Sequence, residues 1–419
     1  MREQGFARAK PKNALFTIHY PLSTIPTIYQ SVPQPKTIFI STGDVSGDLQ
    51  GALLVTALKQ QAQTLGIDLK IVALGGSKMA AAGAEIIADT TFISSIGVWE
   101  ARAYLRPSIQ ARNLAKQYVK ATPPDAIVLI DYVDPNISIG KYAKDLFPDL
   151  PIFFYIAPQD WVWPRQHKRA KLIVSFIDEI FSVFPIEAQY FTEQGAKATF
   201  VGHPLVDRIA TLPSREIARD KLGITNSEVT IALVPASRQQ ELTYILPLIF
   251  TAARQIQDRL PDVKFWIPLA RPDFVAEIES QIKAYQINAT LVTENADLVL
   301  SAADLALTKC GTVSLELALL DVPQVVVYKV SKVTAWIAKN VVKFSIPYMS
   351  PTNLVEMKPI VPELLQDEAT PDRIAAESLE LILNPERRDK MLADYSHMRA
   401  ALGNTGVCDR VAAEILAKI

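Results

Sequence analysis

The sequence predicts an α/β protein made of two doubly wound, Rossmann-like domains that face a central cleft. Short apolar runs alternate with helical segments from residue 37 almost to the C-terminus. Such alternation is typical of parallel sheets that are covered by helices on both faces. A polar, proline-containing stretch at 204–223 separates two of these series, and a length of 419 residues suits two domains.

The chain divides into four predicted parts. Residues 1–36 are rich in basic residues and proline, and we expect a disordered N-terminal extension there. Residues 37–210 and 211–392 form the two Rossmann-like domains. Residues 393–419 are C-terminal helices, and packing back on the N-terminal domain or crossing to another subunit are both open for them.

Composition narrows the class of protein. The net charge of -1 gives no reason to expect a nucleic-acid partner. Two cysteines and four scattered histidines predict neither a disulfide framework nor a metal site. Because no apolar run reaches the roughly 20 residues of a membrane span, we expect an intracellular, soluble chain that can still contact a membrane surface.

In the first domain, each predicted strand ends in a turn or a polar residue. The strand at 37–40 leads into a turn with glycines at 43 and 47, and a helix follows. A short helix is expected around Met79. The other predicted strands lie at 69–74, 126–130, 152–156, 180–184 and 199–201.

The second domain repeats this pattern. Its first predicted strand, 229–234, is followed by a turn at 235–238. The later strands are expected at 263–267, 290–292, 304–307 and 324–328, and the chain after Asn384 is predicted to be helical with breaks near Gly403 and Gly406. Since ligands bind at the carboxyl ends of parallel strands, the turns after these strands are the candidate sites.

Asp131 directly follows the apolar strand 126–130. A carboxylate at the end of a buried strand can act as a general base with a raised pKa, but it can equally be structural, and the residues alone leave both open. Asp134 is expected to cap the next helix, with Pro135 at its first position.

Two turns of the second domain are suited to an anion. Gly311 and Thr312 begin a helix whose first-turn N–H groups favour a phosphate, and Glu316 lies one turn later, where it can reach sugar hydroxyls. An ordinary capped βα turn explains the same residues. Ser237 and Arg238 follow strand 229–234, where Arg238 can neutralise a diphosphate or form a surface pair with Glu241.

Other stretches have weaker functional signals. The turn 41–48 lacks the dinucleotide fingerprint but can hold an anion or a hydroxyl through backbone N–H groups. Trp161 and Trp163 can bind sugars or acyl chains, although such aromatics are more often core residues. The segment 332–344 has lysines beside an apolar face, which suits either an anionic membrane or ordinary packing on a sheet.

Together, these stretches resemble the lipid-A-disaccharide synthase family, a group of inverting glycosyltransferases with the GT-B fold. The resemblance covers residue 37 to about the C-terminus. The matching segments are 43–48, 75–79, 124–131, 155–163, 200–205, 233–238, 310–316, 350–353 and 362–366.

The resemblance implies a reaction of lipid A (lipopolysaccharide) biosynthesis. A UDP-2,3-diacylglucosamine donor would transfer its sugar to the 6-hydroxyl of 2,3-diacylglucosamine 1-phosphate, giving a β-1,6-linked disaccharide 1-phosphate and UDP. No metal and no cofactor are expected. The enzyme would be cytoplasmic and peripherally associated with the inner membrane, with oligomerisation open.

The resemblance also implies roles for individual residues. Asp131 matches the family's essential aspartate and would be the general base, with Arg238 at the diphosphate and Asn353 important for activity. The nucleotide would be bound by Gly311, Thr312, Glu316, Ser237 and Arg238. Substrate binding in the N-terminal domain would involve Gly43, Asp44, Ser46, Gly47, Asp48, Gly76, Trp161 and Trp163.

Several positions depart from the family pattern. Asp44 stands where the family usually has Glu, Ala236 where it has Gly, and Cys310 where it has Ser. Segment 350–353 has Ser-Pro-Thr-Asn instead of Ser-Leu-Pro-Asn. The alternatives are a UDP-N-acetylglucosamine 2-epimerase and a non-catalytic UDP-sugar-binding protein on the same fold.

Overall fold

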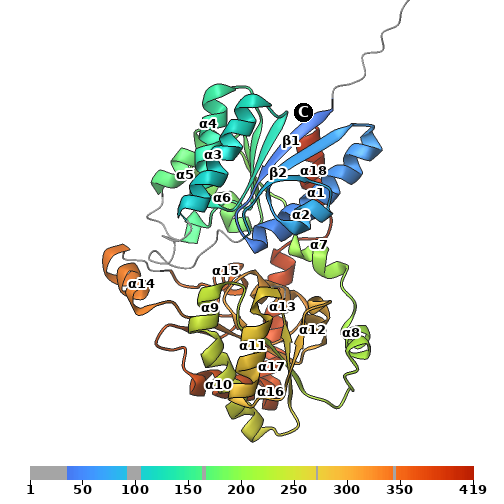
Figure 1. Ribbon diagram of the computed structural model, residues 1–419, viewed down its shortest axis with the longest axis vertical. Helices are drawn as coiled ribbons and strands as arrows, with labels where there is room; N and C mark the ends of the chain where they lie inside the picture. The colour runs from blue at the N-terminus through green and yellow to red at the C-terminus, as the bar shows by residue number, and fades with distance from the viewer. Residues whose placement is uncertain (1–34, 92–104, 163–166, 270–271, 343–345) are drawn as a thin grey trace, which may run out of the picture. The chain divides into compact units, whose positions relative to one another are not determined.

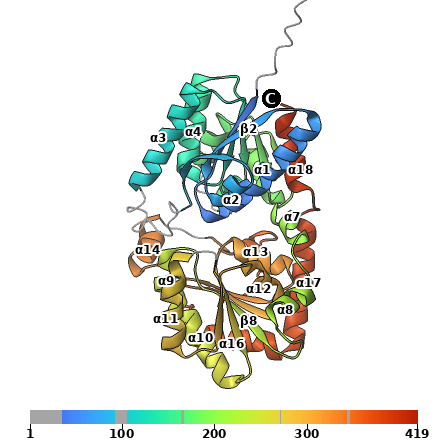
Figure 2. The ribbon, with the colours of Figure 1, turned by 45° about the vertical axis from the view of Figure 1, so that its right-hand side comes forward.

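Two parallel β-sheets organise the chain in the computed structural model, which describes residues 35–91, 105–162, 167–269, 272–342 and 346–419. The helices pack around the two sheets, which occupy separate halves of the chain (Figures 1 and 2). We call the half that contains the first sheet the N-terminal lobe and the other half the C-terminal lobe. The predicted extension at 1–36 lies, up to residue 34, outside the described residues.

The first sheet has the order β3-β2-β1-β4-β5-β6-β7, and its strands run parallel. The strands are β1 (Lys36–Ser41), β2 (Leu69–Gly75), β3 (Glu85–Asp89), β4 (Ala126–Ile130), β5 (Ile152–Tyr155), β6 (Glu179–Ser182) and β7 (Ala198–Phe200). The chain order reverses between β1 and β4, so their carboxyl ends border a crevice.

The second sheet is also parallel and has the order β10-β9-β8-β11-β12-β13. Its strands are β8 (Thr230–Val234), β9 (Lys264–Pro268), β10 (Ala289–Val292), β11 (Leu305–Lys309), β12 (Gln324–Tyr328) and β13 (Glu363–Leu365). Here the order reverses between β8 and β11. Each lobe therefore has one switch point, and the sequence places candidate site residues directly after all four of these strands.

The helices of the N-terminal lobe are α1 (Val45–Leu65), α2 (Ser77–Ala81), α3 (Leu105–Ala121), α4 (Val133–Leu146), α5 (His167–Val174) and α6 (Pro185–Glu193). The C-terminal lobe has α9 (Gln239–Tyr244), α10 (Leu246–Arg259), α11 (Val275–Tyr285), α12 (Ala296–Ala302), α13 (Thr312–Leu319), α14 (Lys332–Ile337), α15 (Pro351–Leu354), α16 (Pro371–Leu383) and α17 (Pro385–Ala401). In the sequence, α7 (Leu205–Ala210) and α8 (Arg215–Leu222) come between the strands of the two sheets, and α8 packs against α12 of the C-terminal lobe.

The last helix, α18 (Val407–Leu416), packs against α1 of the N-terminal lobe, where the Gln61 side-chain amide donates to the Asp409 carbonyl at 2.6 Å. The chain thus crosses between the lobes twice, near Gly202 and near Gly403. His203 N donates to the Leu402 carbonyl at 3.0 Å, which ties the two crossings together. A domain boundary at residue 210 stays a prediction.

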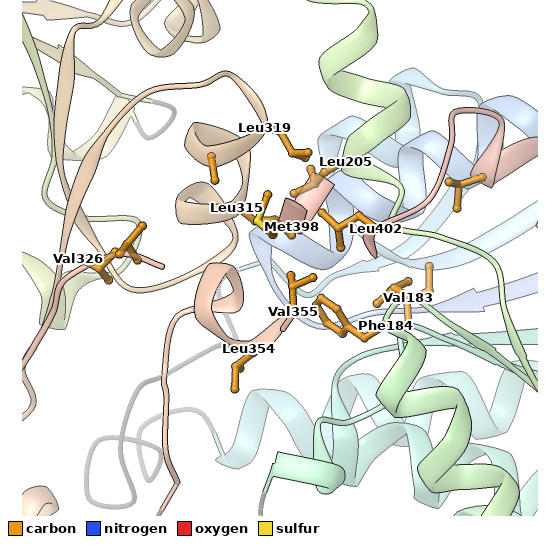
Figure 3. Packing of buried hydrophobic residues seen from close by; sticks show 14 of the residues in the cluster. Val183, Phe184, Leu205, Leu315, Leu319, Val326, Leu354, Val355, Met398 and Leu402 are labelled. Carbon is orange, nitrogen blue, oxygen red and sulfur yellow. The ribbon is translucent and has the colours of Figure 1, made fainter. Parts of the chain in front are cut away.

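The hydrophobic core continues across this junction. Leu205 of α7 and Leu315 of α13 lie near Met398 and Leu402 of the C-terminal crossing (Figure 3). All four side chains are fully buried. Burying one such side chain contributes about 1.5–3 kcal/mol, so these contacts stabilise the packing of α7, α13 and α17 at the junction.

One local prediction is wrong. Helix α4 begins at Val133 with Tyr132 as its N-cap, so Asp134 lies in the first turn instead of capping the helix. The reason is a backbone turn in which Asp131 and Tyr132 both have left-handed conformations, with φ of 45° and 46°. Such conformations cost free energy in residues other than glycine, and they often occur at functional sites.

Candidate functional site

A cavity of about 490 Å³ opens between the carboxyl ends of the two sheets. It receives residues that follow β1, β4, β8 and β11, which are the strands at the two switch points. The lining includes Asp44, Ser46 and Asp131 from the N-terminal lobe and Ser237, Arg238, Gly311, Thr312 and Glu316 from the C-terminal lobe. The cavity therefore brings together most of the predicted site.

Asp131 is the carboxylate at the end of β4. Its side chain is exposed to solvent where it lines the cavity. Desolvation by the surrounding protein and the Asp44 carboxylate raise its pKa, Arg238 and the Tyr132 N–H lower it, and the net pKa is about 7. A carboxylate with such a pKa is suited to accept a proton near neutral pH.

Asp44 and Ser46 connect the two lobes across the cavity. Asp44 caps α1 by accepting from Gly47 N at 2.6 Å, and its second oxygen pairs with Arg238 Nη2 at 3.2 Å. The Ser46 and Thr312 hydroxyls are hydrogen-bonded at 2.7 Å. An anion that binds Arg238 would compete with Asp44, so ligand binding and interlobe contact are linked.

Glu241 shapes the turn that holds Arg238. Its buried Oε2 accepts from Ser237 N at 2.5 Å, from Arg238 N at 3.0 Å and from the Ser237 hydroxyl at 3.1 Å. Its Oε1 lies 3.5 Å from Arg238 Nη1 and 3.8 Å from Lys309 Nζ. Arg238 lines the cavity and Glu241 is buried behind it, so the two do not form a surface pair.

The helix α13 begins at the cavity. Gly311, Thr312 and Val313 line it, and Gly311 has φ of 156°. Residues with a side chain rarely adopt this φ, so the turn favours glycine, whereas the nearest obstacle to a Cβ atom is only the mobile end of the Lys309 side chain at 2.7 Å. Positive charge on Lys309 and Arg238 adds to the dipole at the start of α13, and together they favour a phosphate group.

Glu316 lies one turn into α13 and is buried. Its Oε2 accepts from Arg208 Nη1 at 2.8 Å, while Arg208 Nη2 donates to Asp297 Oδ1 at 2.6 Å. Burial raises the pKa of Glu316, whereas the Arg208 guanidinium lowers it. The carboxylate lines the cavity and can accept a hydrogen bond from a ligand.

Four other predicted residues support the cavity from behind. Asp48 is buried, and its carboxylate accepts from the N–H groups of Gly76, Lys78 and Met79 at 2.8–3.1 Å. A Cβ atom at Gly43 would lie 1.9 Å from the Tyr132 ring, and Gly47 and Gly76 are similarly crowded. These residues shape the turn 41–48 and do not line the cavity.

Two further predicted site residues, Trp161 and Asn353, are buried, pack inside the protein and do not line the cavity. Trp161 is buried and contacts Phe184, with ring centroids 5.8 Å apart, while Trp163 lies outside the described residues. Asn353 is buried: its amide donates to Glu363 Oε1 at 2.7 Å and to the Val361 carbonyl at 3.0 Å. Asn353 therefore fixes the segment that presents Met349 and Pro351 to the cavity.

Four charged residues of the cavity were not among the predicted site residues: Lys78, Arg208, Asp297 and Lys309. Lys309 had a usable signal, because it ends an apolar strand directly before the glycine turn. Arg208 and Asp297 had none, because they meet each other and Glu316 only after the chain folds. Within the described ranges, no group of three or more His, Cys, Asp and Glu residues could hold a metal ion.

These features define a two-domain α/β protein of the GT-B fold, with an anion-suited cavity between its lobes. The family model for lipid-A-disaccharide synthetase matches residues 38–418. A lipid-A-disaccharide synthase from Gloeothece citriformis is 52% identical over 379 residues, which cover 90% of this chain and 99% of that protein. The chain therefore belongs to the lipid-A-disaccharide synthetase family.

Solved structures with low sequence identity share the fold. A putative UDP-N-acetylglucosamine 2-epimerase from Listeria monocytogenes has a TM-score of 0.62 at 16% identity, covering 91% of this chain and 96% of that one. A glycotransferase of kitacinnamycin has a TM-score of 0.57 at 16% identity, covering 92% and 100%. The predicted GT-B fold is confirmed.

Proposed function

We propose that this chain is an inverting glycosyltransferase that condenses UDP-2,3-diacylglucosamine with 2,3-diacylglucosamine 1-phosphate. The products would be the β-1,6-linked disaccharide 1-phosphate and UDP. Family membership supports this activity. The structural observation that supports it is that Asp131 of one lobe lines the same cavity as Arg238 and Glu316 of the other.

The residues of the cavity suggest how the transfer proceeds. Asp131 accepts the proton of the acceptor 6-hydroxyl while that oxygen forms a bond to C1 of the donor sugar. The bond between C1 and the phosphate oxygen breaks, and its electron pair leaves with UDP. Attack opposite the leaving group inverts an α-linked donor to a β-linked product.

The C-terminal lobe would bind the departing nucleotide. Arg238 and the first turn of α13 neutralise the charge that develops on the diphosphate. Glu316 would accept a hydrogen bond from the ribose. The turn 41–48 would shape the acceptor side, with Asp44 and Ser46 facing the cavity. In this scheme Asp48, Gly76 and Asn353 position other residues and do not contact the substrate.

The test is UDP release from the diacylated donor, measured with and without the lipid acceptor. Release that depends on the acceptor, with formation of a disaccharide phosphate, is the expected result. Turnover of UDP-N-acetylglucosamine without an acceptor would instead identify an epimerase. Tight UDP binding without turnover of either donor would identify a non-catalytic binding protein.

We further infer that α14 and the π-helical turn after it (Ala338–Val342) contact an anionic membrane surface. Val333, Trp336 and Val341 are 53%, 61% and 64% exposed, which does not fit packing on the sheet. Lys332 and Lys339 are exposed on the same segment. Apolar and basic side chains together suit the interface of an anionic bilayer. Among the described residues, no helix combines the length and apolar character needed to cross a bilayer.

Replacing Trp336 with glutamate should reduce binding to vesicles of phosphatidylglycerol and phosphatidylethanolamine several-fold, because an acidic residue replaces an apolar anchor. Vesicle cosedimentation measures this. The matched control is Leu383→Glu on α16, which is 63% exposed and should leave binding unchanged. If vesicle binding falls equally in both variants, or does not fall in Trp336→Glu, α14 does not form the membrane contact.

A further inference from the structure

Arg208 is a charged residue of the cavity to which the reaction scheme gives no role. It lies on α7, between the last strand of the first sheet and the first strand of the second. Its side chain is only 12% exposed, and it lines the cavity together with Glu316 and Asp297. A buried guanidinium needs partners to offset its desolvation, and here both partners are carboxylates of the C-terminal lobe.

The two carboxylate oxygens of Glu316 have different surroundings. Oε2 accepts from Arg208 Nη1 at 2.8 Å. In the part of the chain that the structure describes, Oε1 has no hydrogen-bond partner, and the residue faces the cavity. One oxygen is therefore fixed, while the other is available to a ligand hydroxyl.

The surroundings make Arg208 necessary for this arrangement. Glu316 is 7% exposed, and both burial and the nearby Asp297 carboxylate raise its pKa. Without a cation between them, Glu316 would tend to bind a proton or turn away from Asp297. A lysine could not replace Arg208 fully, because an ammonium lacks the planar fork that reaches both carboxylates.

We propose that Arg208 is a positioning residue, an inference that rests on the proposed function. Arg208 keeps Glu316 ionised and orients its carboxylate toward the ribose hydroxyls of the nucleotide. Arg208 thereby makes the site selective for ribonucleoside diphosphates. It does not touch the reacting atoms. Its neighbour Asp207 accepts from Gly406 N at 2.6 Å and from Cys408 N at 2.9 Å, so α7 also anchors the second crossing between the lobes.

The test compares the dissociation constants of UDP and 2′,3′-dideoxy-UDP by calorimetry on the full-length protein. The wild type should prefer UDP by about 10- to 150-fold, the range for a hydrogen bond to a charged group. Arg208→Met should lower this preference to within about threefold, mainly by weakening UDP. Arg208→Lys, which keeps the charge, should retain an intermediate preference.

Two further variants separate positioning from folding. Glu316→Gln should lose the preference as Arg208→Met does, and the double variant should be no worse than either single variant, because both act through one hydrogen bond. Asp297→Asn leaves the Arg208–Glu316 pair in place and should keep the preference. If Arg208→Met fails to fold, the nucleotide preferences of Arg208→Lys and Glu316→Gln still test the role of Arg208.

The contrary outcomes are distinct. Equal weakening of both nucleotides in Arg208→Met, or an unchanged preference, would overturn the role of Arg208. A wild type that binds UDP and dideoxy-UDP equally would also overturn it, while leaving the proposed transfer intact. A wild type that binds no UDP at all would contradict the proposed function itself.

Discussion

Asp131→Asn is expected to lower the rate of sugar transfer by a factor of about 10²–10⁴, the range for loss of a general base, while UDP affinity changes less than twofold. Asparagine has nearly the same shape but cannot accept the proton of the acceptor hydroxyl. The proposed nucleotide contacts come from Arg238, Thr312 and Glu316 of the other lobe, which the substitution does not change. Single-turnover transfer and UDP calorimetry measure the two quantities.

The pH dependence provides a second check on the same residue. Because burial and the Asp44 carboxylate raise the pKa of Asp131 to about 7, only part of the free enzyme has the ionised base at neutral pH. We therefore expect kcat/KM to rise with pH through about 7 and then level off. A profile that stays flat from pH 5.5 to 8.5, or near-normal turnover in Asp131→Asn, would remove Asp131 as the base.

The pH dependence of folding stability gives an independent test of the raised pKa of Asp131. The folded protein holds a proton on Asp131 up to a pH of about 7, whereas the unfolded chain releases it near the usual aspartate pKa. This residue's contribution to stability is thus fully present below the unfolded pKa and is lost as the pH rises through about 7. Asp131→Asn should accordingly raise the melting temperature at pH 8 relative to wild type, and do so less at pH 5.

Local sequence patterns predicted the strands of this fold well. The runs at 126–130 and 324–328 match β4 and β12, because buried parallel strands are short, apolar and bounded by polar residues. The strands β3 and β13 were missed. Both are edge strands, and Glu85 at the start of β3 and Glu363 at the start of β13 interrupt the apolar pattern.

The sequence predicted which turns form the site, but it did not predict which side chains contact one another there. Asp131, Arg238 and Gly311 follow strands at the switch points, so topology alone brings them near one edge of each sheet. The pairs Asp44–Arg238 and Arg208–Glu316 join residues 194 and 108 positions apart, and no local pattern carries that information. Both pairs form only when the folded chain brings these distant segments together.

Family motifs also mix two kinds of residue that a sequence cannot separate. Asp44 and Asp48 stand four positions apart in one turn, yet Asp44 faces the cavity and Asp48 binds three backbone N–H groups behind it. A buried carboxylate with satisfied hydrogen bonds is as constrained as a catalytic one. The structure distinguishes them because only one side chain is open to a ligand.

Arg238→Met should reduce kcat/KM by about 10²–10³, comparable with loss of a single charge-stabilising donor in other enzymes. The guanidinium is oriented by its own turn, where Glu241 fixes the backbone of Ser237 and Arg238. A diphosphate gains negative charge as it leaves, so the interaction strengthens in the transition state, and kcat should fall along with the affinity for UDP. Steady-state kinetics with UDP as a product inhibitor measure both.

Comparison variants decide whether the effect comes from charge at the cavity. Arg373→Met, which removes an exposed pair with Glu368 in the same lobe, should leave kinetics unchanged. Arg238→Lys should retain part of the activity, because it keeps the charge without the bidentate geometry. Asp44→Asn should tighten UDP binding, because Arg238 would no longer have to leave a carboxylate 3.2 Å away. If Arg238→Met stays within threefold of wild type, the diphosphate must be bound elsewhere in the cavity, where Lys78, Arg208 and Lys309 are the other cationic lining residues.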